Sequence, residues 1–235
     1  MPDNAQIHLG DTIDLALYHD GSDSFIKDTG TGALKVCSNL FRVNNAANDE
    51  AMIKAEENAG VTLSYDASTK FETMSTGARI QGGLLFNSDT AAANTLDDYE
   101  EGSYVVTVTG SSSGSFALNP NSFRYTKIGR VVHVTGRFYI VSGSPTGSEA
   151  RVSLPFTASS DIQAQDGRGY SYVTTYNAYS PNNDYQMANS VISGNAYSVL
   201  IWVVPNAAWQ TVSPSSHLNQ RNAYYGFDFS YTTST

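Results

Sequence analysis

The 235-residue sequence has little cysteine, few charged residues and no long apolar run. Its single cysteine, Cys37, excludes an internal disulfide framework and a zinc site made of cysteines alone. We expect Cys37 to be a buried strand residue, because a free cysteine usually behaves as a small apolar side chain. The longest apolar run, Val199 to Pro205, has the length of a strand, and a membrane span needs about 18 residues. We therefore expect no membrane insertion.

Basic residues are also scarce, with 13 Lys and Arg against 22 Asp and Glu. The net charge of −9 argues against a nucleic-acid binder, whose binding face would be basic. Ser, Thr and Asn are abundant instead, and together they number 68. This composition excludes a long helix or coiled coil, which needs Ala, Glu, Lys and Leu. Combined with 27 aromatic residues, it favours short strands joined by many turns.

Charge and aromatic residues divide the chain into two regions. Residues 1–98 hold 6 basic, 15 acidic and 6 aromatic residues, whereas residues 99–235 hold 7 basic, 7 acidic and 21 aromatic residues. A linker of small residues, 87–95, lies at the junction. We predict a thin acidic region over 1–95 and a domain with its own core over 96–235.

The acidic region contains a weak internal repeat, in which residues 17–25 align with 63–71 at an offset of 46. Each copy predicts a strand, a turn rich in Asp, Gly and Ser, and a second strand. Such a unit is too thin to bury its apolar face alone, so it needs stacked repeats or partner chains. Residues 48–59 fit either a short helix capped by Asn48 or a strand over 51–55, and we favour the strand because strand-like units flank it.

The second region predicts an antiparallel β-sandwich or jelly roll, which makes the whole chain all-β. Its residues 130–138 alternate, with Val132, Val134 and Gly136 on one face and Val131, His133, Thr135 and Arg137 on the other. The expected strands are 104–109, 123–128, 130–140, 150–154, 170–176, 185–192, 197–203 and 224–231.

Several segments resemble proteins of one family. Residues 15–34, LALYHDGSDSFIKDTGTGAL, and residues 65–80, YDASTKFETMSTGARI, resemble a repeat of tail-fibre proteins from tailed bacteriophages, marine phages especially. Residues 96–102, LDDYEEG, with residues 125–136, YTKIGRVVHVTG, resemble the opening of a C-terminal domain found on many phage fibres. In that family Thr-Trp-Thr-Pro stands where this chain has Ser-Tyr-Val-Val at 103–106.

The resemblance implies a homotrimer. Residues 1–95 would form an intertwined β-stem, and residues 96–235 would form a jelly-roll-like tip that binds the host receptor. The protein would be part of the virion tail fibre, with upstream fibre or virion proteins as further partners. We expect a C-terminal part of a longer fibre, a short complete fibre being the alternative.

Aromatic residues and polar loops give the best candidates for a binding site, because aromatic faces stack on sugar rings and amide or carboxylate groups hydrogen-bond them. We predict that the strand residues Tyr170, Tyr172 and Trp202 belong to the core. The predicted receptor-binding residues are Tyr176, Tyr179, Asn182, Asn183, Asp184, Tyr185 and Trp209.

The sequence gives little support for a catalytic or a metal-binding site. His19, Asp20 and Asp23 on a turn do not make a ligand set, although an axial ion between three copies stays open. The second region has few carboxylates for a glycosidase pair and no Gly-x-Ser-x-Gly elbow. We predict a non-enzymatic protein without a cofactor or metal.

The predicted function is adsorption to the host surface through a glycan or an outer-membrane protein. Three equivalent weak sites would act together through avidity. Two alternatives remain: a structural fibre or head-decoration protein, and a tip enzyme that trims surface polysaccharide.

Overall fold

The computed structural model describes residues 3, 5–88, 90–91, 95–160, 170–178, 181, 185–205, 207–218 and 223–234. In this part the chain is nearly all β, with antiparallel sheets and one short helix, which confirms the all-β prediction. The chain divides into two compact units, Met1–Gln81 and Gly82–Thr235. None of the described helices is long and apolar enough to cross a membrane.

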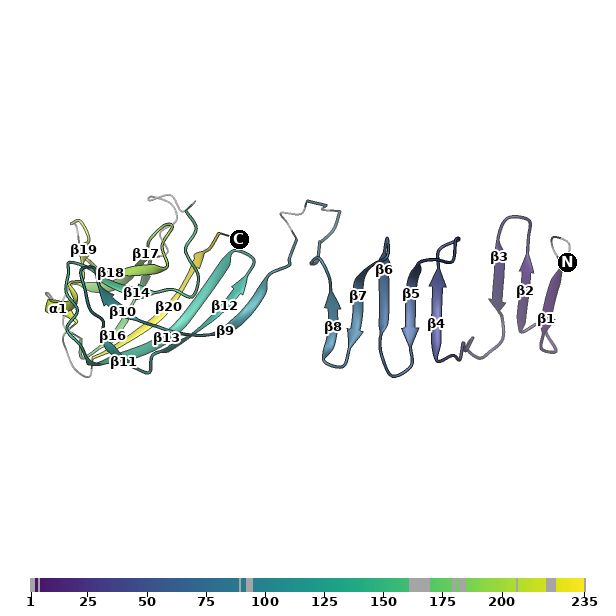
Figure 1. Cartoon of the computed structure of the whole chain (residues 1–235), viewed down its shortest axis with the longest axis horizontal. Coiled ribbons are helices and arrows are strands. Elements are labelled where there is room, and N and C mark those ends of the chain that lie inside the picture. The colour runs from purple at the N-terminus through teal and green to yellow at the C-terminus, as the bar shows by residue number, and fades with distance from the viewer. Residues whose placement is uncertain are drawn as a thin grey trace. The chain divides into compact units, whose positions relative to one another are not determined.

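The first unit contains two single-layered sheets, of three and of five strands (Figure 1). Strands adjacent in sequence are adjacent in each sheet, so every connection is a hairpin. The described strands are β1 (Gln6–Leu9), β2 (Leu15–His19) and β3 (Ser24–Asp28) in one sheet, and β4 (Leu40–Asn44), β5 (Ala51–Glu56), β6 (Val61–Tyr65), β7 (Ser68–Met74) and β8 (Gly77–Ile80) in the other.

The two copies of the sequence repeat form the hairpins β2–β3 and β6–β7, as predicted. The first turn is held by Asp20, whose carboxylate oxygen accepts hydrogen bonds from the N–H groups of Ser22 and Asp23, both at 2.9 Å. The second is a two-residue turn in which Asp66 and Ala67 both have positive φ. The sequence of residues 48–59 fits either a short helix or a strand. In the structure this segment contains β5, so the preference for a strand is confirmed.

The five-stranded sheet has one apolar and one charged face, because side chains alternate along each strand and paired residues share a face. Ion pairs Lys54–Glu56 and Glu72–Arg79, both at 2.6 Å, lie on the charged face. One row of paired residues on the apolar face is Val43, Ile53, Leu63, Phe71 and Ile80, and the matching row on the charged face is Arg42, Lys54, Thr62, Glu72 and Arg79.

No second layer from the described chain covers that apolar face. Ala16 is the one buried side chain among the residues described up to Gln81, and Leu63 and Ile80 are 42% and 48% exposed. The three-stranded sheet repeats the pattern, with Ile7, Leu17 and Ile26 paired in a row. Cys37 is also exposed and lies in the connection between β3 and β4, so its expected burial in a strand is wrong: no described core covers this connection.

The second unit contains two six-stranded antiparallel sheets. In the first sheet the order is β10-β14-β18-β17-β15 with β19 beside β18, and in the second it is β16-β20-β13-β12-β9 with β11 beside β13. Their bounds are β9 (Tyr99–Val105), β10 (Val108–Gly110), β11 (Ala117–Asn119), β12 (Ser122–Ile128), β13 (Val131–Ser142), β14 (Ala150–Ser153), β15 (Tyr170–Tyr172), β16 (Thr174–Tyr176), β17 (Gln186–Val191), β18 (Tyr197–Val203), β19 (Gln210–Thr211) and β20 (Tyr224–Thr232), with helix α1 at Pro214–His217.

The two sheets share one hydrophobic core and form a β-sandwich. Phe123, Phe138 and Phe227 from one sheet and Leu200 and Trp202 from the other are among its buried side chains. The alternation predicted around β13 is confirmed at Val132 and Val134, which are fully buried.

Each side of the sandwich is closed by a segment that passes from one sheet to the other. The chain leaves β9 at one sheet's edge and enters β10 at the edge of the other, with Val106 buried between them. Val173 occupies the same position between β15 and β16 on the opposite side. These crossings place Tyr172 and Tyr176 on edge strands.

The two segments that resemble the fibre domain pair with each other. Residues 99–102 lie opposite residues 125–128 in the β9–β12 pair. Lys127, buried on the inner face, forms an ion pair with Asp98, and its ammonium lies 5.8 Å from the ring of Phe156. A buried lysine needs such a partner, which explains the acidic residue at this position.

Candidate ligand-binding site

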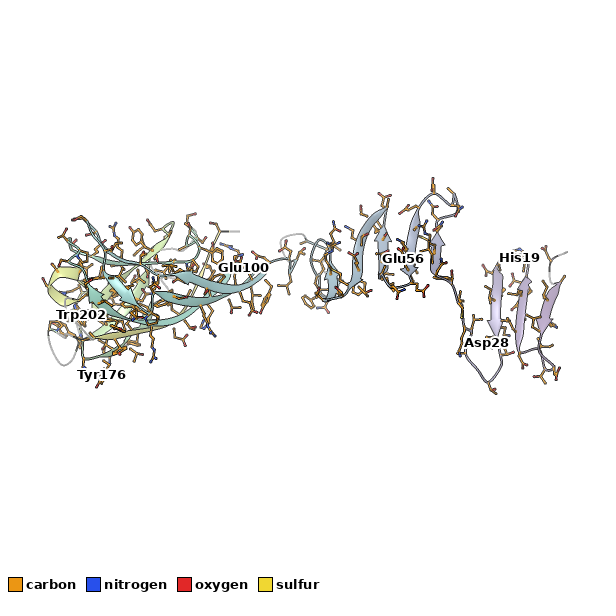
Figure 2. All side chains as sticks on the ribbon, turned by 60° about the horizontal axis from the view of Figure 1, so that its bottom comes forward. His19, Asp28, Glu56, Glu100, Tyr176 and Trp202 are labelled. Atoms are coloured by element: carbon orange, nitrogen blue, oxygen red, sulfur yellow. The ribbon has the colours of Figure 1, made fainter. Side chains whose placement is uncertain are left out.

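The structure describes three of the seven predicted site residues. Tyr176 lies on β16 and is 66% exposed, Trp209 precedes β19 and is 45% exposed, and Tyr185 is half-buried against the core. Figure 2 labels Tyr176 and the buried Trp202 on the sandwich. The remaining four, Tyr179, Asn182, Asn183 and Asp184, lie outside the described residues.

Of the three expected core aromatics, Trp202 is buried and Tyr172 is not. Tyr172 is 66% exposed because its strand, β15, lies at a sheet edge and the ring points away from the core side occupied by Val173. The core prediction is therefore confirmed for Trp202 and wrong for Tyr172. The side chain of Tyr170 lies outside the described part.

A row of three tyrosines crosses the outer face of the second sheet. Tyr224 on β20 pairs with Tyr139 on β13 and with Tyr176 on β16. The ring centroids are 5.3 Å apart for Tyr139–Tyr224 and 6.3 Å apart for Tyr176–Tyr224. At the Tyr139 end of this row, Nδ2 of Asn119 donates a hydrogen bond of 2.7 Å to the Tyr139 hydroxyl. We call Tyr139, Tyr224 and Tyr176 the tyrosine row.

The outward direction of the row follows from strand alternation. Tyr225 and Phe138, the chain neighbours of Tyr224 and Tyr139, are fully buried in the core. Burial raises the pKa of Tyr225 to about 12, because an ionised phenolate would be poorly solvated there. The buried neighbours fix the strands and leave the tyrosine row facing solvent.

Beside the row lies a groove of about 360 Å³, lined by Arg137, Thr174, Thr175, Tyr176, Tyr224 and Gly226. A second row of paired residues, next to the tyrosine row, consists of Arg137, Gly226 and Thr174. Because its middle residue is a glycine, the centre of this row carries no side chain. A Cβ at Gly226 would find its nearest neighbour, the Thr174 Cβ, at an ordinary 3.5 Å. The glycine is therefore not required by packing, and its effect is to leave the groove open against the strand backbone. We call this the tyrosine groove.

A second hollow, of about 490 Å³, shares Thr175 with the tyrosine groove. Tyr172 and Tyr185 line it, together with the core residues Met187 and Trp202. The sequence therefore identified one aromatic residue in each of two neighbouring hollows, Tyr176 and Tyr185. Trp209 lines neither of the two.

A polar hollow of about 590 Å³ lies over β9, β12 and β13, and His133 is part of its wall. Nδ1 of His133 is 3.0 Å from the hydroxyl of Ser230, and Nε2 is 3.6 Å from Asp228. These are the residue types of a hydrolase triad, but all three stand on neighbouring strands of one open sheet face. A triad also requires donors aimed at a developing oxyanion, and the strands here use their amides in sheet pairing.

Glu101 is the one carboxylate among the residues that line this hollow, whereas glycoside hydrolysis uses two facing each other. Across the described residues, no group of three or more His, Cys, Asp or Glu is arranged to hold a metal ion. The tyrosine groove is consequently the better candidate for a functional site.

Sequence reasoning missed six groove or row residues: Arg137, Tyr139, Thr174, Thr175, Tyr224 and Gly226. Alternation placed Arg137 on the face opposite to Val132 and Val134. Tyr224 and Tyr139 each adjoin an aromatic core residue, which is a usable signal for an outward aromatic. Nothing in the sequence indicated that β13, β16 and β20 are neighbours. No protein-family model matches the chain, and no curated protein matches it either.

Proposed function

We propose that the chain is the distal part of a bacteriophage tail fibre that recognises and adsorbs to the host cell surface without catalysis. In this proposal the tyrosine groove binds a surface glycan. The first unit is a trimeric, intertwined stem, and the sandwich, with jelly-roll-like connectivity, is the receptor-binding tip. The protein would act in the virion, joined to upstream fibre or virion proteins.

The observation that carries the proposal is the tyrosine row next to Gly226, which leaves a gap in the neighbouring row of side chains. Flat sugar rings stack on exposed aromatic faces, and a ring that settles over Gly226 reaches the strand backbone without steric obstruction. Hydroxyl groups of Thr174, Tyr176 and Tyr224 surround the gap and can both donate and accept hydrogen bonds. This combination suits a glycan better than a flat protein surface, because a sugar can enter a groove of this size.

The first unit supports the fibre part of the proposal. Two single-layered sheets with uncovered apolar faces cannot be stable alone in water, because a sheet needs a second layer over its apolar face. Three copies that place these faces around one axis would supply that layer. The tip would then present three equivalent grooves, so weak single contacts combine into avid adsorption.

The test is glycan binding by the full chain, measured on an array of bacterial surface saccharides and then by titration of a binding sugar. Tyr224→Ala removes the central ring and is expected to weaken binding about tenfold. Gly226→Val fills the gap and is expected to weaken binding at least as much, and its Cβ would meet the Thr174 Cβ at an ordinary 3.5 Å.

Ser103→Val is the matched control, since it adds an apolar side chain to an exposed position of β9, at the opposite edge of the same sheet. It is expected to leave binding unchanged. Unchanged binding in both groove variants would overturn the site. A wild-type protein that binds no surface glycan would overturn the function, and release of reducing ends would favour the enzyme alternative.

A further inference from the structure

The tyrosine groove carries a single charged residue, Arg137 on β13. The Arg137 side chain is exposed and lies on the same sheet face as the tyrosine row. It is two positions before Tyr139 on β13, in the neighbouring row of paired residues. In the described part of the chain its guanidinium takes part in no ion pair. A guanidinium that has no ion-pair partner among the described residues is available to a ligand.

Other arginines of the sandwich are engaged within the fold or beside an acid. Arg151 forms an ion pair with Glu149 at 2.9 Å, and Arg130 donates hydrogen bonds to the Thr233 carbonyl and the Ser159 hydroxyl. Arg124 lines the polar hollow that also contains Glu101. Among the described arginines of the sandwich, Arg137 is the one that lines the tyrosine groove.

The acids near the groove do not neutralise Arg137. No carboxylate is among the residues that line the groove. The next outward position along β20 is Asp228, and its Oδ1 lies 3.6 Å from Nε2 of His133, on the side away from the groove. The groove is therefore locally positive in a protein whose net charge is −9.

We propose that the ligand of the tyrosine groove is an acidic saccharide, whose ring stacks on the tyrosine row while a uronic-acid carboxylate pairs with Arg137. This inference rests on the proposed glycan-binding function and narrows it to one chemical class. The planar guanidinium matches a carboxylate with two parallel hydrogen bonds, which a neutral sugar does not offer.

The overall negative charge does not prevent such binding. The acidic excess resides in residues 1–98, while residues 99–235 hold 7 basic and 7 acidic residues. At physiological ionic strength charges are screened beyond about 8 Å, so contact with Arg137 outweighs remote repulsion. The same screening makes affinity for the acidic ligand decrease as salt is added.

The experiment compares two probes, a tetramer of galacturonic acid and its carboxyl-reduced, neutral counterpart, by calorimetric titration of the full chain. We expect the acidic probe to bind about tenfold more tightly than the neutral one. Arg137→Gln is expected to abolish that difference, and Arg137→Lys is expected to retain part of it. Arg124→Gln makes the same charge change on the same sheet face outside the groove, and it should preserve the preference.

The outcomes separate this inference from the function on which it rests. Equal binding of both probes by the wild type would overturn the inference that the ligand is acidic. It would not contradict the proposed glycan-binding site. A sulfated tetramer preferred over the galacturonate would overturn the assignment of a carboxylate. Binding of neither probe, together with no binding on the glycan array, would overturn both proposals.

Discussion

The two units bury an apolar sheet face to very different extents. In the second unit each six-stranded sheet is covered by the other, and Val132, Val134 and Phe138 are fully buried. In the first unit no described layer of that unit covers the apolar row through Leu63, and Ala16 is the one buried side chain among its described residues. The comparison teaches that an alternating strand pattern specifies a two-faced sheet, while the second layer has to come either from the same chain or from another.

The largest expected difference between the units concerns a buried phenylalanine. Phe138 lies within 6.0 Å, between ring centroids, of Phe123, Tyr225 and Phe227. Phe138→Ala should lower the free energy of unfolding of the sandwich by about 3–5 kcal/mol, because it removes contacts and leaves a cavity. Denaturant titration followed by tryptophan fluorescence measures this, since both tryptophans lie in the second unit.

Phe41→Ala is the matched control in the first unit, where Phe41 is 41% exposed. It should leave the sandwich transition unchanged. A loss of similar size in both variants would contradict the contrast between a covered and an uncovered sheet.

The next expected effect is on self-association of the first unit. Leu63→Asp places a charge in the middle of the apolar face and should weaken association at least about tenfold, because an interface cannot desolvate an unpaired carboxylate cheaply. Thr62→Asp makes a comparable change on the charged face and should have little effect. Sedimentation analysis over a dilution series distinguishes the two, and a wild-type mass of one chain at all concentrations would contradict the trimer.

The sandwich is expected to fail in alkali. Burial raises the pKa of Tyr225 from 10.0 to about 12, and burial likewise raises the pKa of Tyr104 and Tyr231. The unfolded chain releases these protons first, so their contribution to stability is full below pH 10 and is lost as the pH rises through the folded values.

Circular dichroism against pH measures this loss. Tyr225→Phe removes one titrating group and should move the alkaline midpoint upward. Tyr65→Phe, at a position that is 75% exposed in the first unit, should not move it. Identical midpoints for wild type and Tyr225→Phe would contradict the burial argument.

The smallest effect is expected in the β2–β3 turn, at acid pH. The N–H groups of Asp23 and Ser22 lower the pKa of Asp20 below its ordinary 3.8, because they stabilise the carboxylate. The turn is therefore stabilised above pH 3.8, and the stabilisation is lost as the pH falls through the lowered value. Protection of the Ser22 and Asp23 amides, measured against the intrinsic exchange rate at each pH, should fall there in the wild type, and Asp20→Asn should remove this pH dependence of the protection. Wild-type protection that does not change through this range would refute the role of the carboxylate.

Much of the fold was predictable from local pattern. Alternation over 130–138 placed Val132 and Val134 on one face and Arg137 on the other, and the repeat located the β2–β3 and β6–β7 hairpins of the first unit. The errors are at Cys37 and Tyr172. Tyr172 is exposed because its strand lies at a sheet edge, and Cys37 is exposed because it lies in the connection between β3 and β4, away from any described core.

The candidate site was predictable only in part. Tyr176 was identified because it stands among several nearby tyrosines, and it is the one groove residue that the sequence identified. Tyr139 and Tyr224 are separated from it by 37 and 48 positions along the chain, and Gly226 has no feature that distinguishes it from a turn glycine. The site exists because three distant strands pair with one another.

The sequence by itself determined that the chain is all-β, that its acidic excess lies in the first 98 residues, and where several strands of the second unit lie, among them β17, β18 and β20. Those properties follow from side-chain periodicity, turn residues and charge, which act over short distances along the chain. The tertiary structure decided which faces are covered, which tyrosines meet and that Gly226 leaves a gap beside Arg137. These depend on strand order and register, which are fixed by contacts between residues far apart in sequence.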